Sequence, residues 1–97
     1  MRNVYLICYD VADAKRLRLT YKTMCGFGVS VQYSIFRCEL SPNEKHSLKE
    51  ALWSILNWQH DRVMLVDLGP AGARGDQCVA FWGDPRSAIP DRRAVII

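Results

Sequence analysis

Two segments of this chain are apolar at nearly every position, and they constrain its fold more than any other feature. Residues 4–9 (VYLICY) and 63–68 (VMLVDL) are rich in residues that favour β-strands. Successive side chains of a strand point to opposite faces of its sheet, so both faces of these two strands are apolar. A sheet that contains them must therefore be covered on both sides.

Two helices are predicted between the strands. Asp13 is a suitable N-cap for a helix over residues 14–25, and Gly26 follows at the position of a C′ glycine. The expected apolar stripe of this helix is Ala14, Leu17, Tyr21 and Met24. Residues 41–44 (SPNE) form a capping box that opens a second helix to about Asn57. Its expected inward stripe is Leu48, Leu52 and Ile55, flanked by Ala51 and Leu56.

The region of residues 29–40 alternates between apolar and polar side chains, but the alternation changes phase at Ile35–Phe36. A one-residue shift in a period-two pattern predicts either a β-bulge or two short strands that meet at a bend. Further along, residues 69–76 (GPAGARGD) are expected to form a mobile loop and residues 78–82 (CVAFW) another strand. The chain ends in a short apolar β-type tail, residues 94–97.

This order of elements predicts an α+β fold, a ferredoxin-like β-α-β-β-α-β sandwich with an additional C-terminal strand. We place the ferredoxin-like domain at residues 1–82 and a C-terminal extension at residues 83–97, whose tail is available for dimer or partner contact. Two helices cover only one face of the sheet, so the other apolar face needs a partner, and another copy of the chain is the simplest candidate. The sequence therefore predicts a homodimer.

The composition is typical of one small globular domain that is neither secreted nor embedded in a membrane. Of the 97 residues, 49% are hydrophobic and 24% are charged, and no stretch approaches the roughly 20 apolar residues of a membrane span. The N-terminus lacks the features of a signal peptide. The cysteines form no C-x-x-C motif, and Cys8, Cys38 and Cys78 lie in apolar runs. This pattern predicts buried, reduced thiols in the cytoplasm rather than disulfides or a zinc site.

Asp10 ends the first strand, and its side chain is expected on the same sheet face as those of Val4, Leu6 and Cys8. One role open to Asp10 is to shape the turn into the helix, although Asp13 already serves there. If this face is the dimer face, two-fold symmetry brings two Asp10 carboxylates together, and they repel unless a proton or a cation lies between them. Mg²⁺ prefers oxygen ligands and water, so a magnesium site is the second role. The residues alone leave both roles open.

The net charge is only +3, but the cations are unevenly distributed. Four of them lie close together in the first predicted helix: Lys15, Arg16, Arg18 and Lys22. At about 100° per residue, Lys15, Arg18 and Lys22 share one face, while Arg16 projects from the other flank. A solvated helix face is the ordinary interpretation of such a group. Three of these cations nevertheless oppose the helix dipole in the first turns, which favours an anionic ligand such as phosphate.

Other patterns carry less information. Ser34 and Phe36 flank the phase change, where a bulge residue beside a core aromatic is the ordinary interpretation. The glycine-rich residues 69–75 lack the Gly-Lys-Ser/Thr sequence of a phosphate-binding loop. His46 and His60 have no nucleophile that the pattern places near them, so histidine-dependent nucleophilic catalysis is not expected.

Several of these segments together resemble a known family. They are Tyr9-Asp10-Val11, residues 15–18 (KRLR), residues 26–28 (GFG) and residues 32–36 (QYSIF). In combination they are similar to the CRISPR-associated "Cas-two" family of small adaptation proteins. The resemblance covers essentially the whole chain, and its one departure is conservative, since Ile35 stands where valine is usual.

The resemblance implies a ferredoxin-like homodimer in which the Asp10 side chains of two subunits face each other. It implies a Mg²⁺-dependent phosphodiesterase site that acts on RNA or double-stranded DNA, with Asp10 as the metal-binding catalytic residue. Residues that would line or support this site are Tyr9, Arg16, Arg18, Ser34 and Phe36. The candidate nucleic-acid-binding residues are Lys15, Arg16, Arg18, Lys22 and Arg74. The resemblance also implies that the protein bridges two dimers of the "Cas-one" integrase and holds a DNA fragment that becomes a spacer.

Two functions therefore stay open. One is a metal-dependent endonuclease, in which two Asp10 carboxylates share one Mg²⁺. The other is a non-catalytic DNA scaffold that uses its cations against phosphates. A toxin-type small ribonuclease of the same fold is a third alternative, because a fold does not determine a function.

Overall fold

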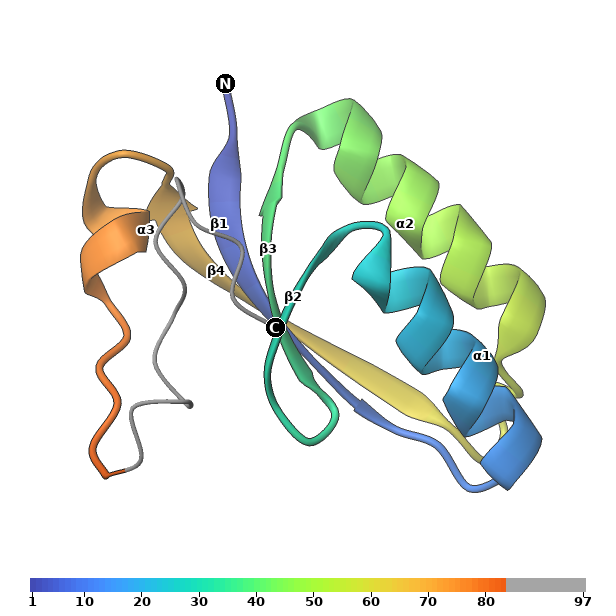
Figure 1. The fold of residues 1–97 in the computed structure, drawn as a ribbon. Coiled ribbons are helices and arrows are strands. Elements are labelled where there is room, and N and C mark those ends of the chain that lie inside the picture. Colours follow the sequence, from blue (N-terminus) through green and yellow to red (C-terminus); the bar gives the residue numbers. More distant parts are fainter. Residues whose placement is uncertain (84–97) are drawn as a thin grey trace.

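The computed structural model describes residues 1–83, and its elements follow the predicted order (Figure 1). Along the chain come strand β1 (Asn3–Asp10), helix α1 (Ala14–Cys25), strands β2 (Gly28–Gln32) and β3 (Ile35–Leu40), helix α2 (Pro42–Ile55), strand β4 (Arg62–Pro70) and the short helix α3 (Arg74–Gln77). The first six elements have the order of the ferredoxin-like fold, which confirms the predicted fold class. The predicted tail, residues 94–97, lies outside the described residues.

The four strands form one antiparallel sheet in the order β2-β3-β1-β4. In the register of the sheet, Ile7 of β1 lies opposite Phe36 of β3 and Leu65 of β4. Helices α1 and α2 lie side by side over one face (Figure 1). The sheet is therefore covered by long helices on one side only, as the sequence predicts.

Both long helices begin at the predicted caps. The Asp13 carboxylate accepts a hydrogen bond from the backbone N–H of Arg16 at 2.9 Å. At α2, the Ser41 hydroxyl accepts from the Glu44 N–H at 3.2 Å, and the Glu44 carboxylate accepts from the Ser41 N–H at 2.8 Å. The end of α1 differs from the prediction, because Gly26 keeps a right-handed conformation with φ −80° instead of the left-handed one of a C′ glycine.

The buried face of α1 also differs from the prediction. Its buried residues are Thr20 and Met24, whereas Leu17 and Tyr21 are 38% and 49% exposed. Thr20 tolerates burial because its hydroxyl donates a hydrogen bond to the Arg16 carbonyl oxygen at 2.8 Å. The stripe through Leu17 and Tyr21 is therefore wrong, since a threonine with a satisfied hydroxyl takes the inward position.

A β-hairpin explains the phase change within residues 29–40. Strands β2 and β3 pair antiparallel, and Tyr33 and Ser34 form the turn between them. Ser34 has φ 56°, and no other non-glycine residue within residues 1–83 has a positive φ. The register also shifts between Ser30 and Gln32, so a bend and an irregularity of the ladder both occur.

The chain after β4 differs most from the prediction. Strand β4 runs to Pro70 and residues 74–77 are helical, so most of the expected loop has regular structure. Helix α3 packs closely on the sheet at Gly75, where a Cβ would lie 2.5 Å from the Gly69 carbonyl oxygen and 2.8 Å from Val4 Cγ2. Residues 78–82 form no strand, and Trp82 is 94% exposed. The additional strand predicted at residues 78–82 is therefore wrong, because these residues join no strand of the four-stranded sheet.

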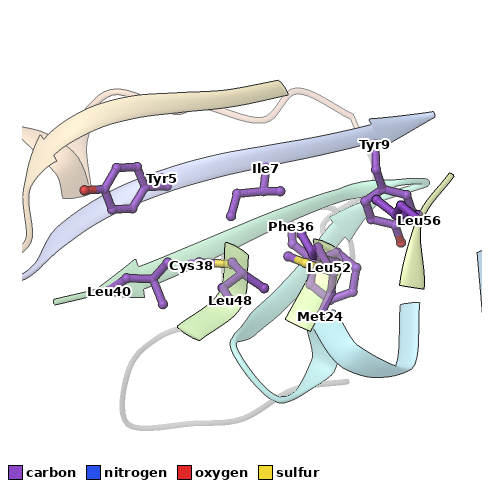
Figure 2. Packing of buried hydrophobic residues seen from close by; sticks show 10 residues of the cluster. All are labelled: Tyr5, Ile7, Tyr9, Met24, Phe36, Cys38, Leu40, Leu48, Leu52 and Leu56. Atoms are coloured by element: carbon purple, nitrogen blue, oxygen red, sulfur yellow. The ribbon is translucent and has the colours of Figure 1, made fainter. Parts of the chain in front are cut away.

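The hydrophobic core lies between the sheet and the two long helices (Figure 2). Its buried members are Tyr5, Ile7, Tyr9, Met24, Phe36, Cys38, Leu40, Leu48, Leu52 and Leu56. Leu48 and Leu52 face inward as predicted, while α2 ends at Ile55 instead of Asn57. The odd-numbered core residues of β1 face the helices, so the side chains of Leu6, Cys8 and Asp10 lie on the opposite face.

This opposite face, which we call the helix-free face, carries an apolar surface. Leu6 lies opposite Val66, and Cys8 lies opposite Met64. Met64 and Val66 are 57% and 37% exposed. Helix α3 packs on the sheet near Val4, at the end of β1 remote from Asp10. Within residues 1–83, the rest of this apolar surface is open to solvent, and it is the face for which the sequence predicts a partner.

All four cysteines are free thiols. Cys38 is buried and Cys8 is half-buried, but Cys78 is exposed and contradicts its predicted burial, because residue 78 follows α3 away from the core. Burial raises the pKa of the Cys38 thiol to about 12. No helix within residues 1–83 has the length and apolar character needed to cross a membrane.

Candidate functional site

Asp10 is the last residue of β1 and lies opposite Arg62, the first residue of β4. Its side chain is exposed and makes no hydrogen bond or ion pair with another residue of the described part of the chain. Residues 1–83 contain no group of three His, Cys, Asp or Glu side chains that could hold a metal ion. A metal ion at Asp10 would therefore need further ligands from water and from a second copy of the chain.

A buried carboxylate that the sequence analysis missed lies next to this strand end. The Asp61 side chain has no exposed surface, and it accepts hydrogen bonds from Ala12 N at 2.9 Å and from Asn57 N at 2.9 Å. It also accepts from Arg16 Nε at 2.8 Å and from Arg16 Nη2 at 3.1 Å. These bonds join the β1–α1 turn, the first turn of α1 and the segment before β4. Asp61 therefore holds in place the turn that begins directly after Asp10.

The electrostatics of this junction follow from its hydrogen bonds. The Arg16 guanidinium, helped by the two backbone N–H groups, holds the pKa of Asp61 well below its usual range. Asp61 is thus an anion whose charge Arg16 compensates. In the sequence, Asp61 stands in a polar stretch between α2 and β4 and carries no motif that distinguishes it from a surface residue.

The predicted cationic cluster on α1 divides into two kinds of residue. The Arg16 side chain is 26% exposed and its guanidinium is paired with Asp61. Lys15, Arg18 and Lys22 are exposed and have no hydrogen-bond or ion-pair partner within residues 1–83. The shared face that the helical spacing predicts is therefore available to an anionic ligand, and the flank that carries Arg16 is occupied by an internal contact.

Tyr9, Ser34 and Phe36 lie behind Asp10 rather than beside its carboxylate. Tyr9 is buried on the helix side, where its ring stacks on Phe36 with 6.2 Å between centroids. Phe36 has no exposed surface. The Tyr9 N–H donates to the Ser34 carbonyl oxygen at 3.0 Å. Burial raises the pKa of the Tyr9 hydroxyl to about 12, so it stays protonated at neutral pH. These three residues support the end of β1, and Phe36 itself offers no surface to a substrate.

Arg74 lies at the other end of the sheet. It begins α3, which follows Pro70, and Pro70 pairs with Asn3 at the start of β1. Asp10 lies seven residue steps along the strand from Asn3, which amounts to about 23 Å. The structure therefore places Arg74 at the end of the sheet remote from Asp10.

The order of the elements and the single antiparallel sheet define a small ferredoxin-like protein, with an exposed, unpartnered carboxylate at the end of its first strand and three unpaired cations on its first helix. Residues 3–74 match the family model described as CRISPR associated protein Cas2. The chain belongs to this family, which confirms the resemblance to the "Cas-two" proteins.

Individual relatives agree with this assignment. The CRISPR-associated endoribonuclease Cas2 1 of Rhodospirillum rubrum is 41% identical over 69 residues, which are 71% of this chain and 68% of the relative. The CRISPR-associated endoribonuclease Cas2 of Geobacter sulfurreducens is 38% identical over 71 residues, which are 73% of this chain and 75% of the relative. The crystal structure of Streptococcus pyogenes Cas2 at pH 6.5 superposes with a TM-score of 0.70 at 28% identity, covering 82% of this chain and 99% of that chain.

Proposed function

We propose that this chain is a Mg²⁺-dependent endonuclease of a CRISPR system that cleaves phosphodiester bonds in RNA or double-stranded DNA as a homodimer. The observation that carries the proposal is the exposed, unpartnered Asp10 carboxylate at the end of a strand whose apolar outer face is open. The names of the two relatives above, both endoribonucleases, support the reaction class.

The homodimer follows from the helix-free face. A second copy on this face would cover Met64 and Val66, which are otherwise partly exposed apolar side chains beside Leu6 and Cys8. A two-fold dimer uses the same surface on both subunits, so each residue near the axis meets its own copy. Asp10 lies on the same face, and the dimer would therefore offer two carboxylates to one ion.

Two carboxylates suit Mg²⁺, which takes oxygen ligands and keeps several waters. When bound, the ion supplies a water of lowered pKa and neutralises charge on the phosphoryl group. The chain's own residues do the rest of the work. Asp10 would hold the ion, Asp61 keeps the adjoining turn in place through Ala12, and Lys15 and Arg18 would orient the phosphates of the substrate.

The test is cleavage of a labelled single-stranded RNA and a labelled duplex DNA by purified wild type, Asp10→Asn and Glu50→Gln, with Mg²⁺ or with EDTA. Glu50 is an exposed carboxylate of α2, so its substitution removes the same charge elsewhere. We expect wild type and Glu50→Gln to cleave only with Mg²⁺, and Asp10→Asn to remain folded but inactive. Cleavage by Asp10→Asn at the wild-type rate would refute the proposed nuclease.

A second candidate function is a DNA scaffold in the acquisition of new spacers, in which the protein bridges two dimers of the "Cas-one" integrase. The unpaired Lys15, Arg18 and Lys22 favour this function, because they suit phosphates without requiring catalysis. If Asp10→Asn binds duplex DNA normally and supports spacer acquisition in cells, the scaffold function is sufficient. If the variant binds normally but acquisition stops, the carboxylate has a role beyond binding.

A further inference from the structure

A cleft of about 990 Å³ opens between α1 and the β2–β3 hairpin, two segments that can be followed in Figure 1. Leu17, Arg18 and Tyr21 line it from α1, residues 30–34 line it from the hairpin, and Tyr9 lines it from β1. Leu17 and Tyr21 are the apolar residues that the helical period places in the core but that the fold leaves partly exposed. Their exposed surface gives this cleft an apolar, aromatic wall.

We propose that this cleft binds an unpaired base of a single-stranded nucleic acid. This proposal rests on the proposed function, since it specifies that the nucleic acid bound at this end of the sheet is single-stranded. Two tyrosines supply the stacking surface: Tyr21 is 49% exposed, and Tyr33, at the hairpin turn, is 99% exposed. Bases stack on such rings without regard to sequence, because every base has an aromatic face.

The charge of the cleft suits the phosphate that accompanies a base. Arg18 is the only charged residue among the described residues that line it, and its side chain has no partner within residues 1–83. No carboxylate of the described chain lines the cleft to repel an anion. Gln32 and Ser34 also line it and have side chains that both donate and accept hydrogen bonds, which suits the edge of a base.

The walls of the cleft are held in place from behind. The Tyr21 ring meets the buried Phe36 ring edge-on, with 5.5 Å between centroids, and Tyr9 stacks on the same ring. The Tyr9 N–H to Ser34 carbonyl bond ties the hairpin turn to β1. A base would therefore meet a preformed surface on the Tyr21 side of the cleft, which lowers the entropic cost of binding.

The cleft also lies close to the carboxylate of the proposed nuclease site. Tyr9 lines the cleft, and Asp10 is the next residue, with its side chain on the other face of the sheet. The cleft and the carboxylate thus lie at the same end of β1 but on opposite faces of the sheet, and a single strand with a base in the cleft would have to pass round the end of the sheet to reach Asp10. A paired base would first have to leave its duplex, which favours single strands.

The test is fluorescence anisotropy in EDTA, where binding is measured without cleavage. The probes are a fluorescein-labelled single-stranded RNA, the same RNA with consecutive abasic residues, and a blunt duplex. The proteins are wild type, Tyr33→Ala and the control Trp53→Ala, which removes a 56% exposed ring from α2. Tyr33 is almost fully exposed, so its removal leaves the fold intact.

We expect wild type to bind the intact RNA about 5- to 150-fold more tightly than the abasic RNA, the range that stacking of one base on an aromatic ring gives. Tyr33→Ala should lose most of this ratio and keep its affinity for the abasic RNA and the duplex. Trp53→Ala should behave as wild type. Quenching of 2-aminopurine in the RNA, lost in Tyr33→Ala, would report the stacked base directly.

The proposal is overturned if wild type does not bind the single strand, if it binds intact and abasic RNA equally, or if Tyr33→Ala weakens all three probes alike. This result is separable from the proposed nuclease. If the protein cleaves RNA but binds intact and abasic RNA equally, the base-binding cleft is refuted and the proposed nuclease is not. If the protein binds intact RNA more tightly than abasic RNA but cleaves neither RNA nor DNA, the proposed nuclease is refuted and the base-binding cleft is not.

Discussion

The two arginines at the start of α1 should contribute very differently to nucleic-acid binding. Arg16 donates two hydrogen bonds to the buried Asp61, so its charge is already compensated within the protein. Arg18 is exposed and has no partner within residues 1–83. The perturbation is therefore a pair of matched substitutions two residues apart, Arg16→Ala and Arg18→Ala.

The expected change in the salt dependence of binding follows from counting the unpaired cations of α1. Lys15, Arg18 and Lys22 have no partner within residues 1–83, so a dimer would offer about six to a duplex, and each phosphate contact adds about 0.9 to the log–log salt slope. A slope of about −5 weakens binding roughly 10³-fold between 50 and 200 mM salt. Arg18→Ala removes one contact per subunit and should reduce the slope by about 1.8. Arg16→Ala should leave the slope unchanged.

The assay is a fluorescence-anisotropy salt titration on one duplex, repeated on a second sequence. Affinity should depend little on sequence, since phosphate contacts carry no base information. Arg16→Ala should instead lower the temperature of unfolding, because Asp61 stays buried without its cation. The reasoning is refuted if Arg16→Ala changes the slope as much as Arg18→Ala. A slope that neither substitution changes would place the duplex elsewhere, with Arg74 as the next residue to test.

Three further predictions concern the dimer and the stability of the fold. Met64→Asp should give a monomer by sedimentation at micromolar concentration, because each subunit loses about 1–2 kcal/mol of apolar burial and gains an unpaired carboxylate in the interface. The control Leu19→Asp, whose substitution lies on α1, should stay dimeric, and a dimeric Met64→Asp would place the interface elsewhere. Because Arg16 lowers the pKa of Asp61, the ionised carboxylate stabilises the fold fully above about pH 4, and this stabilisation is lost as the pH falls below that value. The unfolding temperature of wild type should therefore fall more in acid than that of Asp61→Asn, and an equal fall in both proteins would contradict this. Ser41→Ala should lower the free energy of unfolding in urea by about 1 kcal/mol, since it removes the cap of α2, and an unchanged midpoint would contradict the role of the cap.

Local signals explain why so much of the fold is predictable. The caps at Asp13 and Ser41 act over three residues, and both helices begin where these residues predict. The alternation of side chains along a strand acts over even shorter distances, and it predicts that Asp10 shares a face with Leu6 and Cys8, which the structure shows to be the face opposite the helices. The phase change before Phe36 likewise corresponds to a hairpin whose two strands meet at Ser34.

The sequence by itself thus determined the first six elements, their order and the β1 side chains that share a face with Asp10, because each depends on neighbours along the chain. The tertiary structure alone decided the partner of Arg16, since Asp61 lies 45 positions away and reaches it only in the folded protein. It also decided that Thr20 is buried while Tyr21 borders a cleft, because the period of a helix does not say which polar groups find partners inside. The same holds for α3, whose Gly75 is buried by a close approach to Val4 that no local pattern records.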